Sequence, residues 1–157
     1  MQRFILLCTI AQWVAISASG EIWSTDYEKA LRKAKEENRH VLVDFTGSDW
    51  CGWCIRLNRE VFSTDEFKEF AQKHLVCVKI DFPRKKKLPP EVAERNLQLQ
   101  RKFGVRGYPT VFVLRPDGTL VARTGYLKGG GEGYVSHLKS FIQSTSGQTS
   151  PRTRQSD

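Results

Sequence analysis

Residues 41–54 read Val41-Leu42-Val43-Asp44-Phe45-Thr46-Gly47-Ser48-Asp49-Trp50-Cys51-Gly52-Trp53-Cys54, and this stretch decides the fold. Its first five residues form a short apolar run, which is typical of a strand buried on both faces. A loop follows over 46–49, and the two cysteines are three positions apart, so both can lie on the first turn of a helix. A thiol at a helix N-terminus is close to unpaired N–H groups that favour its thiolate, the nucleophile of disulfide exchange. The stretch therefore predicts a strand and a helix that begins with a reactive thiol pair.

Residues 1–20 have the layout of a secretory signal peptide. Arg3 gives a positive start, an apolar run continues with breaks to Ile16, and residues 17–20 are small, so we expect cleavage near residues 18–20. An uncleaved anchor is the alternative, but the run is shorter than the ~20 residues that span a bilayer. The segment predicts a secreted or periplasmic protein, in a compartment where disulfides persist.

The composition is that of one basic domain. The chain has 157 residues, enough for a single core, and its net charge of +8 can favour acidic partners or an anionic surface. Without residues 1–20 the cysteines are Cys51, Cys54 and Cys77, an odd number that indicates a redox pair and one buried thiol rather than a framework of structural disulfides. The basic run Arg84–Lys87 has no interleaved aromatic residue, so we interpret it as a solvated loop and expect no nucleic-acid partner.

The order of the predicted elements indicates an α/β fold. We expect strands over 41–45, 75–82, 110–114 and 119–122, and helices over 26–38, from 51, from 63–65, over 89–103 and over 132–143. The first helix is predicted from apolar residues at helical spacing that include Trp23, Tyr27 and Ala34. Alternating strands and helices imply parallel pairing, and the turn at 115–118 implies a final antiparallel hairpin. The prediction is a central mixed sheet flanked by helices, with a C-terminal β-hairpin and helix, over residues 21–143, followed by a disordered tail over 144–157.

A cysteine pair of this spacing also occurs in zinc sites and in structural disulfides. Zinc takes about four ligands, and the chain has no second C-x-x-C motif. His40, His74 and His137 are scattered, and Cys77 cannot complete a ligand set alone. We therefore expect no metal, and the redox interpretation leads.

Three motifs in order resemble the thioredoxin superfamily. They are the strand 41–45, the pair with its flanking tryptophans at 50–54, and the loop Gly104-Val105-Arg106-Gly107-Tyr108-Pro109-Thr110. The resemblance covers roughly residues 22–143 and is closest to secreted bacterial thioredoxin-like proteins, a group that includes the periplasmic domains of transmembrane thiol reductases. It implies a thioredoxin fold and a thiol–disulfide oxidoreductase that needs no cofactor, because the electrons come from its own dithiol.

The resemblance also assigns roles to the residues that match its motifs. Cys51 would be the exposed nucleophile, Cys54 would resolve the mixed disulfide, and the two would form a redox-active disulfide. Asp44 would be a buried carboxylate of raised pKa that accepts the Cys54 proton. A solvent-facing strand-end aspartate is the alternative, and the seven positions from Asp44 to Cys51 are one more than is usual in thioredoxins.

The substrate-binding residues implied by the resemblance are Trp50, Trp53, Tyr108 and Pro109. The Tyr108–Pro109 bond would be cis and would present the Tyr108 backbone to a peptide in strand-like pairing. Trp50 would pack under the loop, whereas Trp53 would be exposed to substrate in the place of the usual proline. Cys77 matches the position of a family lysine and is expected to be a buried apolar side chain.

These assignments predict an enzyme that reduces disulfides in protein substrates, is a monomer and is re-reduced by a membrane thiol reductase. A disulfide oxidase or isomerase is the alternative, disfavoured because no inserted helical domain is evident. A thioredoxin-fold binding or chaperone module is the other, disfavoured because an idle site needs neither the cysteine pair nor the Tyr108-Pro109 loop.

Overall fold

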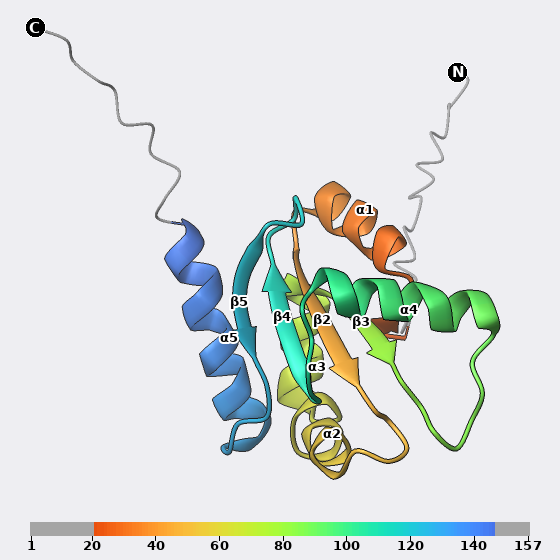
Figure 1. Cartoon of the computed structure of the whole chain (residues 1–157). Coiled ribbons are helices and arrows are strands. Elements are labelled where there is room, and N and C mark those ends of the chain that lie inside the picture. Colours follow the sequence, from red (N-terminus) through yellow and green to blue (C-terminus); the bar gives the residue numbers. More distant parts are fainter. Residues whose placement is uncertain (1–20, 147–157) are drawn as a thin grey trace, which may run out of the picture.

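A five-stranded sheet lies at the centre of the protein (Figure 1). The computed structural model describes residues 21–146. The strands are β1 (Trp23–Ser24), β2 (His40–Thr46), β3 (Leu75–Asp81), β4 (Thr110–Leu114) and β5 (Leu120–Thr124). The helices are α1 (Tyr27–Glu37), α2 (Gly52–Leu57), the π-helical segment η1 (Asn58–Phe62), α3 (Asp65–His74), α4 (Pro90–Lys102) and α5 (Gly130–Ser146).

β2 occupies the centre of the sheet, whose strand order is β1-β3-β2-β4-β5. It pairs in parallel with β3 and antiparallel with β4, and β5 completes the hairpin with β4. Every residue of β2 after His40 is buried, as the apolar run predicts for a strand covered on both faces. The mixed sheet with its C-terminal hairpin and helix confirms the predicted fold class.

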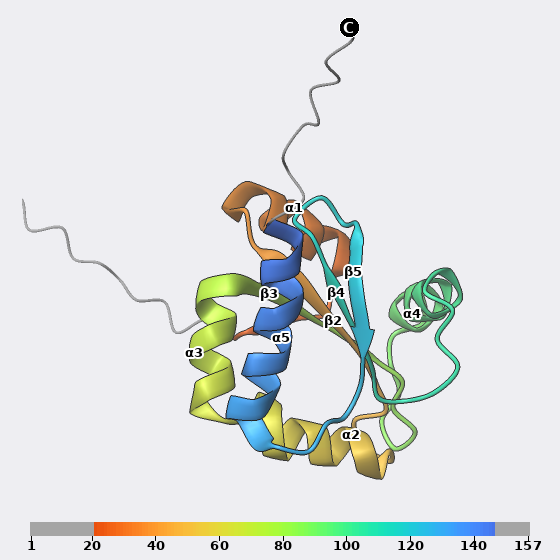
Figure 2. The ribbon, with the colours of Figure 1, turned by 90° about the vertical axis from the view of Figure 1, so that its left-hand side faces the viewer.

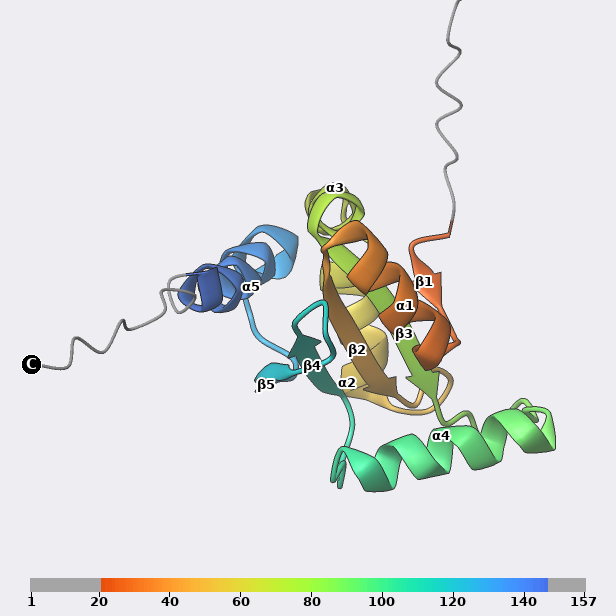
Figure 3. The same cartoon turned by 90° about the horizontal axis from the view of Figure 1, so that it is seen from above.

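Helices cover both faces of this sheet and define two cores (Figures 2 and 3). On one face α1 and α4 pack against Val41, Val43 and Phe45 of β2. On the other, α2, η1, α3 and α5 pack against a core that contains Leu42 of the same strand and Val111 of β4. Successive side chains of β2 therefore enter opposite cores, and Asp44, two positions after Leu42, is directed to the α2 side.

Capping residues set the helix boundaries. The Asp26 carboxylate accepts the N–H of the third residue of α1 at 3.0 Å, and Asn38 ends that helix in the left-handed conformation with a φ of 50°. Thr64 caps α3 in the same way as Asp26 caps α1. Gly104 follows α4 with a φ of 61°, which glycine adopts without steric cost. These capping residues explain why α1 and α3 begin, and why α1 and α4 end, close to the predicted boundaries.

The predicted helix over 26–38 is confirmed, but Trp23, whose spacing placed it on the apolar face of that helix, lies in a strand before it. The Asp26 cap starts α1 after it, and Trp23 lies in β1, in parallel register with Cys77 of β3. Its ring packs against Phe62 and Phe67, with ring centroids 4.8 and 6.2 Å apart. This short edge strand brings the N-terminal part of the domain onto the sheet.

The ends of the domain differ in part from the prediction. α5 begins at Gly130 and runs to Ser146, past Ser144, where the sequence predicts the start of a tail. The rest of that tail and the predicted signal peptide, residues 1–20, lie outside the described residues. Within residues 21–146, no helix combines the length and the apolar character needed to cross a bilayer.

Replacing Phe67 with alanine tests the core beneath α2 and α3. Phe67 is fully buried and contacts Trp23 and Phe62. We expect Phe67→Ala to lower the free energy of unfolding by about 3–5 kcal/mol in denaturant titrations at fixed redox state. The control is Leu97→Ala on α4, where the side chain is 41% exposed, and about 0.5 kcal/mol or less is expected. Equal losses in the two variants would contradict this description of the core.

Candidate active site

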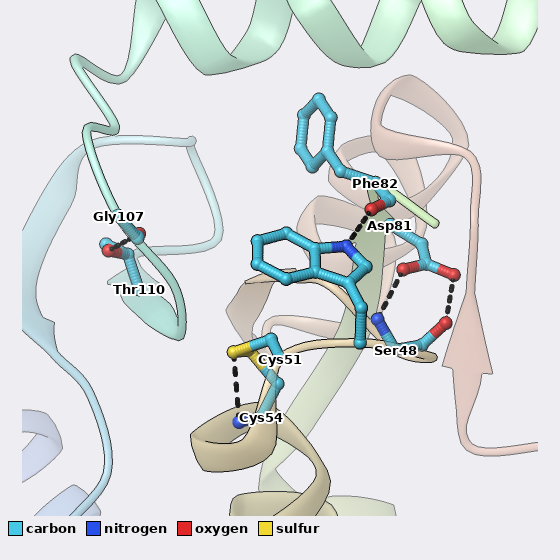
Figure 4. Close-up of a disulfide and its surroundings, with 8 residues drawn as sticks. Ser48, Cys51, Cys54, Asp81, Phe82, Gly107 and Thr110 are labelled. Carbon is cyan, nitrogen blue, oxygen red and sulfur yellow. Dashed lines mark hydrogen bonds between the residues drawn. A yellow bond between two sulfur atoms is a disulfide. The ribbon is translucent and has the colours of Figure 1, made fainter. Parts of the chain in front are cut away.

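The two cysteines meet at the start of α2 (Figure 4). Cys51 is the N-cap residue and forms a disulfide with Cys54, with Cα atoms 5.2 Å apart. The Cys54 N–H donates to Cys51 Sγ at 3.3 Å, which satisfies one of the otherwise unpaired N–H groups of the first turn. α2 continues directly into η1, so the helical segment behind Cys51 extends to Phe62. The sulfur of Cys51 thus lies where the helix favours negative charge.

Both cysteines are largely buried in this disulfide form. Cys51 is 8% exposed and Cys54 4%, so the exposed nucleophile expected at Cys51 is wrong in degree, although Cys51 is the more accessible of the two. The loop between Gly107 and Thr110 lies across from the disulfide (Figure 4).

The loop before Cys51 is tied to the end of β3. Ser48 donates two hydrogen bonds to the Asp81 carboxylate, from N–H at 2.9 Å and from Oγ at 2.6 Å. The Trp50 indole N–H donates to Phe82 O at 2.7 Å. A Cβ on Gly47 would overlap the Trp50 ring, so the close approach of the indole requires glycine there. These contacts set the point at which α2 begins.

Asp49 holds the basic segment that follows β3. Its carboxylate accepts the backbone N–H groups of Arg84, Lys85 and Lys86 at 2.9, 2.9 and 3.3 Å. The hydrogen bond from Arg84 is the main cause that lowers the pKa of Asp49. The Arg84 guanidinium lies 3.6 Å from the centroid of the Trp50 ring, a cation–π contact. Sequence reasoning missed Ser48 and Asp49, whose polar side chains directly before a cysteine pair were the available signal.

The Tyr108–Pro109 bond is cis, as the resemblance implies. The Tyr108 ring packs edge-on against Trp50 at 6.0 Å between centroids and lies 5.3 Å from Phe82. Its hydroxyl accepts a hydrogen bond from Gln100 of α4 at 2.9 Å. Tyr108 therefore joins the proline loop to the same aromatic group that supports the cysteine loop.

Asp44 is 3% exposed, which excludes the solvent-facing alternative. Burial raises its pKa to about 7, with the Lys79 charge acting in the opposite direction and Asp81 adding to the rise. Its Oδ1 accepts no hydrogen bond from the described residues. Lys79 of β3 lies in register with Asp44 of β2. A lysine therefore lies beside the buried carboxylate, two positions after Cys77, where the family lysine was expected. Matching Cys77 to the family lysine in the sequence did not reveal that Lys79 pairs with Asp44.

Trp53 is 55% exposed, and its ring packs on a support formed by Tyr126, Arg56 and Glu60. Its ring lies 5.2 Å from that of Tyr126, and the Arg56 guanidinium lies over both rings at 5.5 and 5.2 Å. Glu60 fixes this support by accepting hydrogen bonds from Tyr126 Oη at 2.6 Å and Arg56 Nε at 2.8 Å. The bond from Tyr126, followed by that from Arg56, lowers the pKa of Glu60 to about 2. Sequence reasoning missed Arg56, Glu60 and Tyr126, since only the fold brings Tyr126 to α2.

Cys77 is apart from this chemistry. It is a buried, free thiol on β3, and burial raises its pKa. Across residues 21–146, no group of three or more His, Cys, Asp or Glu side chains is arranged to hold a metal ion.

Comparison with known proteins agrees with this geometry. The model of the thioredoxin-like domain family matches residues 27–130. The chain is 38% identical to disulfide bond reductase DsbH of Chlamydia pneumoniae over 128 residues, which are 82% of this chain and 76% of that protein. It is 33% identical to thioredoxin-related protein DsbJ of the same organism over 104 residues, 66% of this chain but 30% of that protein.

A solved structure of a DsbH oxidoreductase superposes with a TM-score of 0.74 at 36% identity, covering 88% of this chain and 95% of that one. The match therefore extends from the fold to the sequence over most of both chains. With its helix-capping cysteine pair facing a cis-proline loop, the chain belongs to the thioredoxin-like family and is a thiol–disulfide oxidoreductase.

Proposed function

We propose that the protein reduces disulfides in protein substrates by dithiol–disulfide exchange. The observation that carries the proposal is the Cys51–Cys54 disulfide at the start of α2, facing the Tyr108–Pro109 loop. The relative whose name is disulfide bond reductase DsbH supports this direction of electron flow. Between β3 and β4 the described chain has α4 and no larger helical insertion, which also favours a reductase over an oxidase that grips long peptides.

The reaction begins with both thiols reduced. The Cys51 thiolate attacks one sulfur of the substrate disulfide, so that a mixed disulfide forms and the other substrate sulfur leaves as a thiolate. Cys54 then loses its proton and attacks Cys51 Sγ, which breaks the mixed disulfide and releases the second substrate thiolate. Two electrons pass to the substrate, which takes up two protons, and the enzyme ends with the Cys51–Cys54 disulfide seen here.

The helix supports the choice of Cys51 as the nucleophile. Cys51 Sγ already accepts the Cys54 N–H, and the same donor would stabilise a thiolate on Cys51. Cys54 lies within the first turn, where it is less exposed and its sulfur is close enough to attack Cys51 Sγ. Accessibility and electrostatics therefore assign the two steps to different sulfurs.

Asp44 is the proposed acceptor of the Cys54 proton. Its carboxyl group is directed to the α2 side of β2, and a pKa near 7 lets it exchange a proton at neutral pH. Lys79, in register beside it, stabilises the ionised form before the proton arrives. The acceptor thus works in a buried site that water reaches poorly.

The substrate chain is proposed to lie between the proline loop and Trp53. The backbone of Tyr108 would pair with an extended substrate segment, and Pro109 has no N–H that would compete. Trp50 supports this loop from beneath through Tyr108, and the exposed Trp53 ring on the first turn of α2 offers an apolar contact beside the disulfide. The substrate would therefore contact both the proline loop and the Trp53 ring while its disulfide is at Cys51.

The protein is proposed to act after export, in a secreted or periplasmic location. Residues 1–20 have the pattern of a signal peptide, and substrate disulfides persist in oxidising compartments. A reductase in such a compartment needs a source of electrons, for which a membrane thiol reductase is the proposed partner. Re-reduction would proceed by the same exchange, with the partner's dithiol attacking the Cys51–Cys54 disulfide.

Variants of the two cysteines test the proposed order of attack. Cys51→Ser removes the nucleophile and should abolish reduction of insulin disulfides in the presence of dithiothreitol. Cys54→Ala retains the nucleophile but cannot resolve the intermediate, so a covalent adduct with substrate should accumulate on a non-reducing gel. Cys77→Ala serves as the matched control and should keep its activity. Activity in Cys51→Ser, or an adduct on Cys51→Ser in place of Cys54→Ala, would contradict the assignment.

The pH dependence of stability tests the state of Asp44. Because folding raises the Asp44 pKa from 3.8 to about 7, its ionisation costs the oxidised wild type stability as pH rises through this interval. Asp44→Asn avoids that cost, so the difference in free energy of unfolding between the variant and the wild type should grow in favour of the variant, by on the order of 4 kcal/mol, from about pH 4 to about pH 7. Denaturant titrations over this range measure the difference.

A second measurement on Asp44→Asn separates its proton-transfer role from its effect on stability. Without the acceptor, mixed disulfides should resolve more slowly at neutral pH in rapid-quench experiments, and the rate should recover at alkaline pH. Stability curves that run parallel across the pH range would contradict the raised pKa. An unchanged resolution rate at every pH would contradict the role in proton transfer.

A further inference from the structure

A groove lies beside the active site, between the segment 83–88 and α4. It encloses about 390 Å³ and has apolar walls that include Phe82, Leu88, Ala93 and Leu97. Leu97 is a large apolar residue of α4, yet 41% of its surface is exposed. The groove is thus an apolar surface that the fold of the described chain leaves uncovered.

Asn96 lines this groove and has an unused acceptor. The side chain is 4% exposed, and its Nδ2 donates to Asp81 O at 2.9 Å. Its Oδ1 accepts no hydrogen bond from residues 21–146. Leaving a buried acceptor unpaired costs about 1–3 kcal/mol, so a ligand that offers an N–H group here gains from the contact.

Positive charge surrounds the same groove. Arg84, Lys85, Lys86 and Lys87 are consecutive and exposed. Arg84, Lys86 and Lys87 line the groove, and Lys85 lies between them in the sequence. Lys86 contacts Asp81 at 3.6 Å, Arg84 lies on the Trp50 ring and the charge of Lys85 acts on Asp49, whereas Lys87 forms no ion pair with a described carboxylate. Asp49 fixes the backbone of this segment, so the part of the chain that carries these cations is held in place before any ligand binds.

The groove and the disulfide are physically connected. Trp50, directly before Cys51, bonds to Phe82 O and contacts Arg84, and both of these residues line the groove. The segment after β3 and the start of α2 lie at the same end of the sheet (Figure 1). A polypeptide whose disulfide is at Cys51 can therefore extend to the groove.

We propose that this groove binds an acidic segment of the protein substrate in an extended conformation. The carboxylates of the segment would face Lys87, which lines the groove, and the exposed Lys85 on the same stretch of chain, and an apolar side chain would contact Leu97. A backbone N–H would donate to Asn96 Oδ1, which is covered in the free protein, as the side chains of the groove rearrange around the segment. A simple anion supplies neither the N–H group nor the apolar side chain, which is why a peptide fits better. The inference rests on the proposed function and deepens it, since it defines the preferred substrates as proteins with an acidic segment near the reducible disulfide.

Two model substrates test this preference. Both are synthetic peptides with one disulfide, flanked either by Glu-Glu-Leu-Glu-Glu or by Gln-Gln-Leu-Gln-Gln. The double variant Lys85→Glu/Lys87→Glu should lose about tenfold in kcat/KM for the acidic peptide and keep the wild-type value for the neutral one. The matched control is Lys33→Glu/Lys35→Glu on α1, which changes the net charge equally away from the groove and should change neither value.

The kinetic outcomes separate the two levels of the proposal. If the wild type reduces neither peptide, the proposed function fails. If it reduces both with equal kcat/KM, only the groove inference is overturned. Equal losses for the two peptides in the double variant, or the same loss in the α1 control, would also overturn it, because the effect would then come from altered folding or from net charge.

Direct binding of a cysteine-free peptide tests the role of Asn96. The probe is acetyl-Glu-Glu-Leu-Glu-Glu-amide, titrated into the isotope-labelled oxidised protein while the Asn96 side-chain amide signals are followed by NMR. We expect these signals and those of 83–88 to shift, and Leu97→Ser to weaken binding severalfold. No shift would overturn the proposal. Equal shifts with inorganic phosphate at the same concentration would overturn it in favour of a small-anion site.

Discussion

The two hydrogen bonds from Ser48 to the Asp81 carboxylate are the constraint on which the rest of the site depends. They join the loop after β2 to the end of β3 and so determine where α2 begins. Cys51 is then the N-cap residue of that helix, and Cys54 lies on its first turn. Asp49 of the same loop accepts backbone N–H groups of the basic segment, so this segment is joined to the loop as well.

The same end of the sheet connects the residues proposed for proton transfer with those proposed to bind the substrate. Asp81 adds to the raised pKa of Asp44, while its backbone oxygen accepts the hydrogen bond from Asn96. Trp50 lies between the proline loop and the basic segment, in contact with Tyr108 and Arg84. The proposed proton acceptor, disulfide, proline loop and acidic-peptide groove are thus parts of one contact network rather than separate sites.

Much of the fold and of the cysteine site could be predicted from the sequence, because local patterns encode them. The apolar run of β2, the cysteine spacing and the proline loop each have a short signature. β1 could not be predicted in this way, since two residues have no periodicity and Trp23 fits a helical pattern equally well. The Asp44–Lys79 pairing depends on strand register, and the contact of Tyr126 with Glu60 joins positions far apart in the chain. The groove at Asn96 likewise exists only once α4 packs beside the basic segment.

The reduction potential of the Cys51–Cys54 pair tests most directly whether this dithiol works as a reductant. Trp53 replaces the proline that is usual in thioredoxins, so the potential cannot be carried over from the family. Equilibration of the full protein with glutathione buffers, followed by quantification of the free thiols, gives its value. A reductase requires a potential below about −220 mV, in the range of thioredoxin and glutaredoxins. A value near about −120 mV, that of a strong oxidant, would contradict the proposed direction of electron flow.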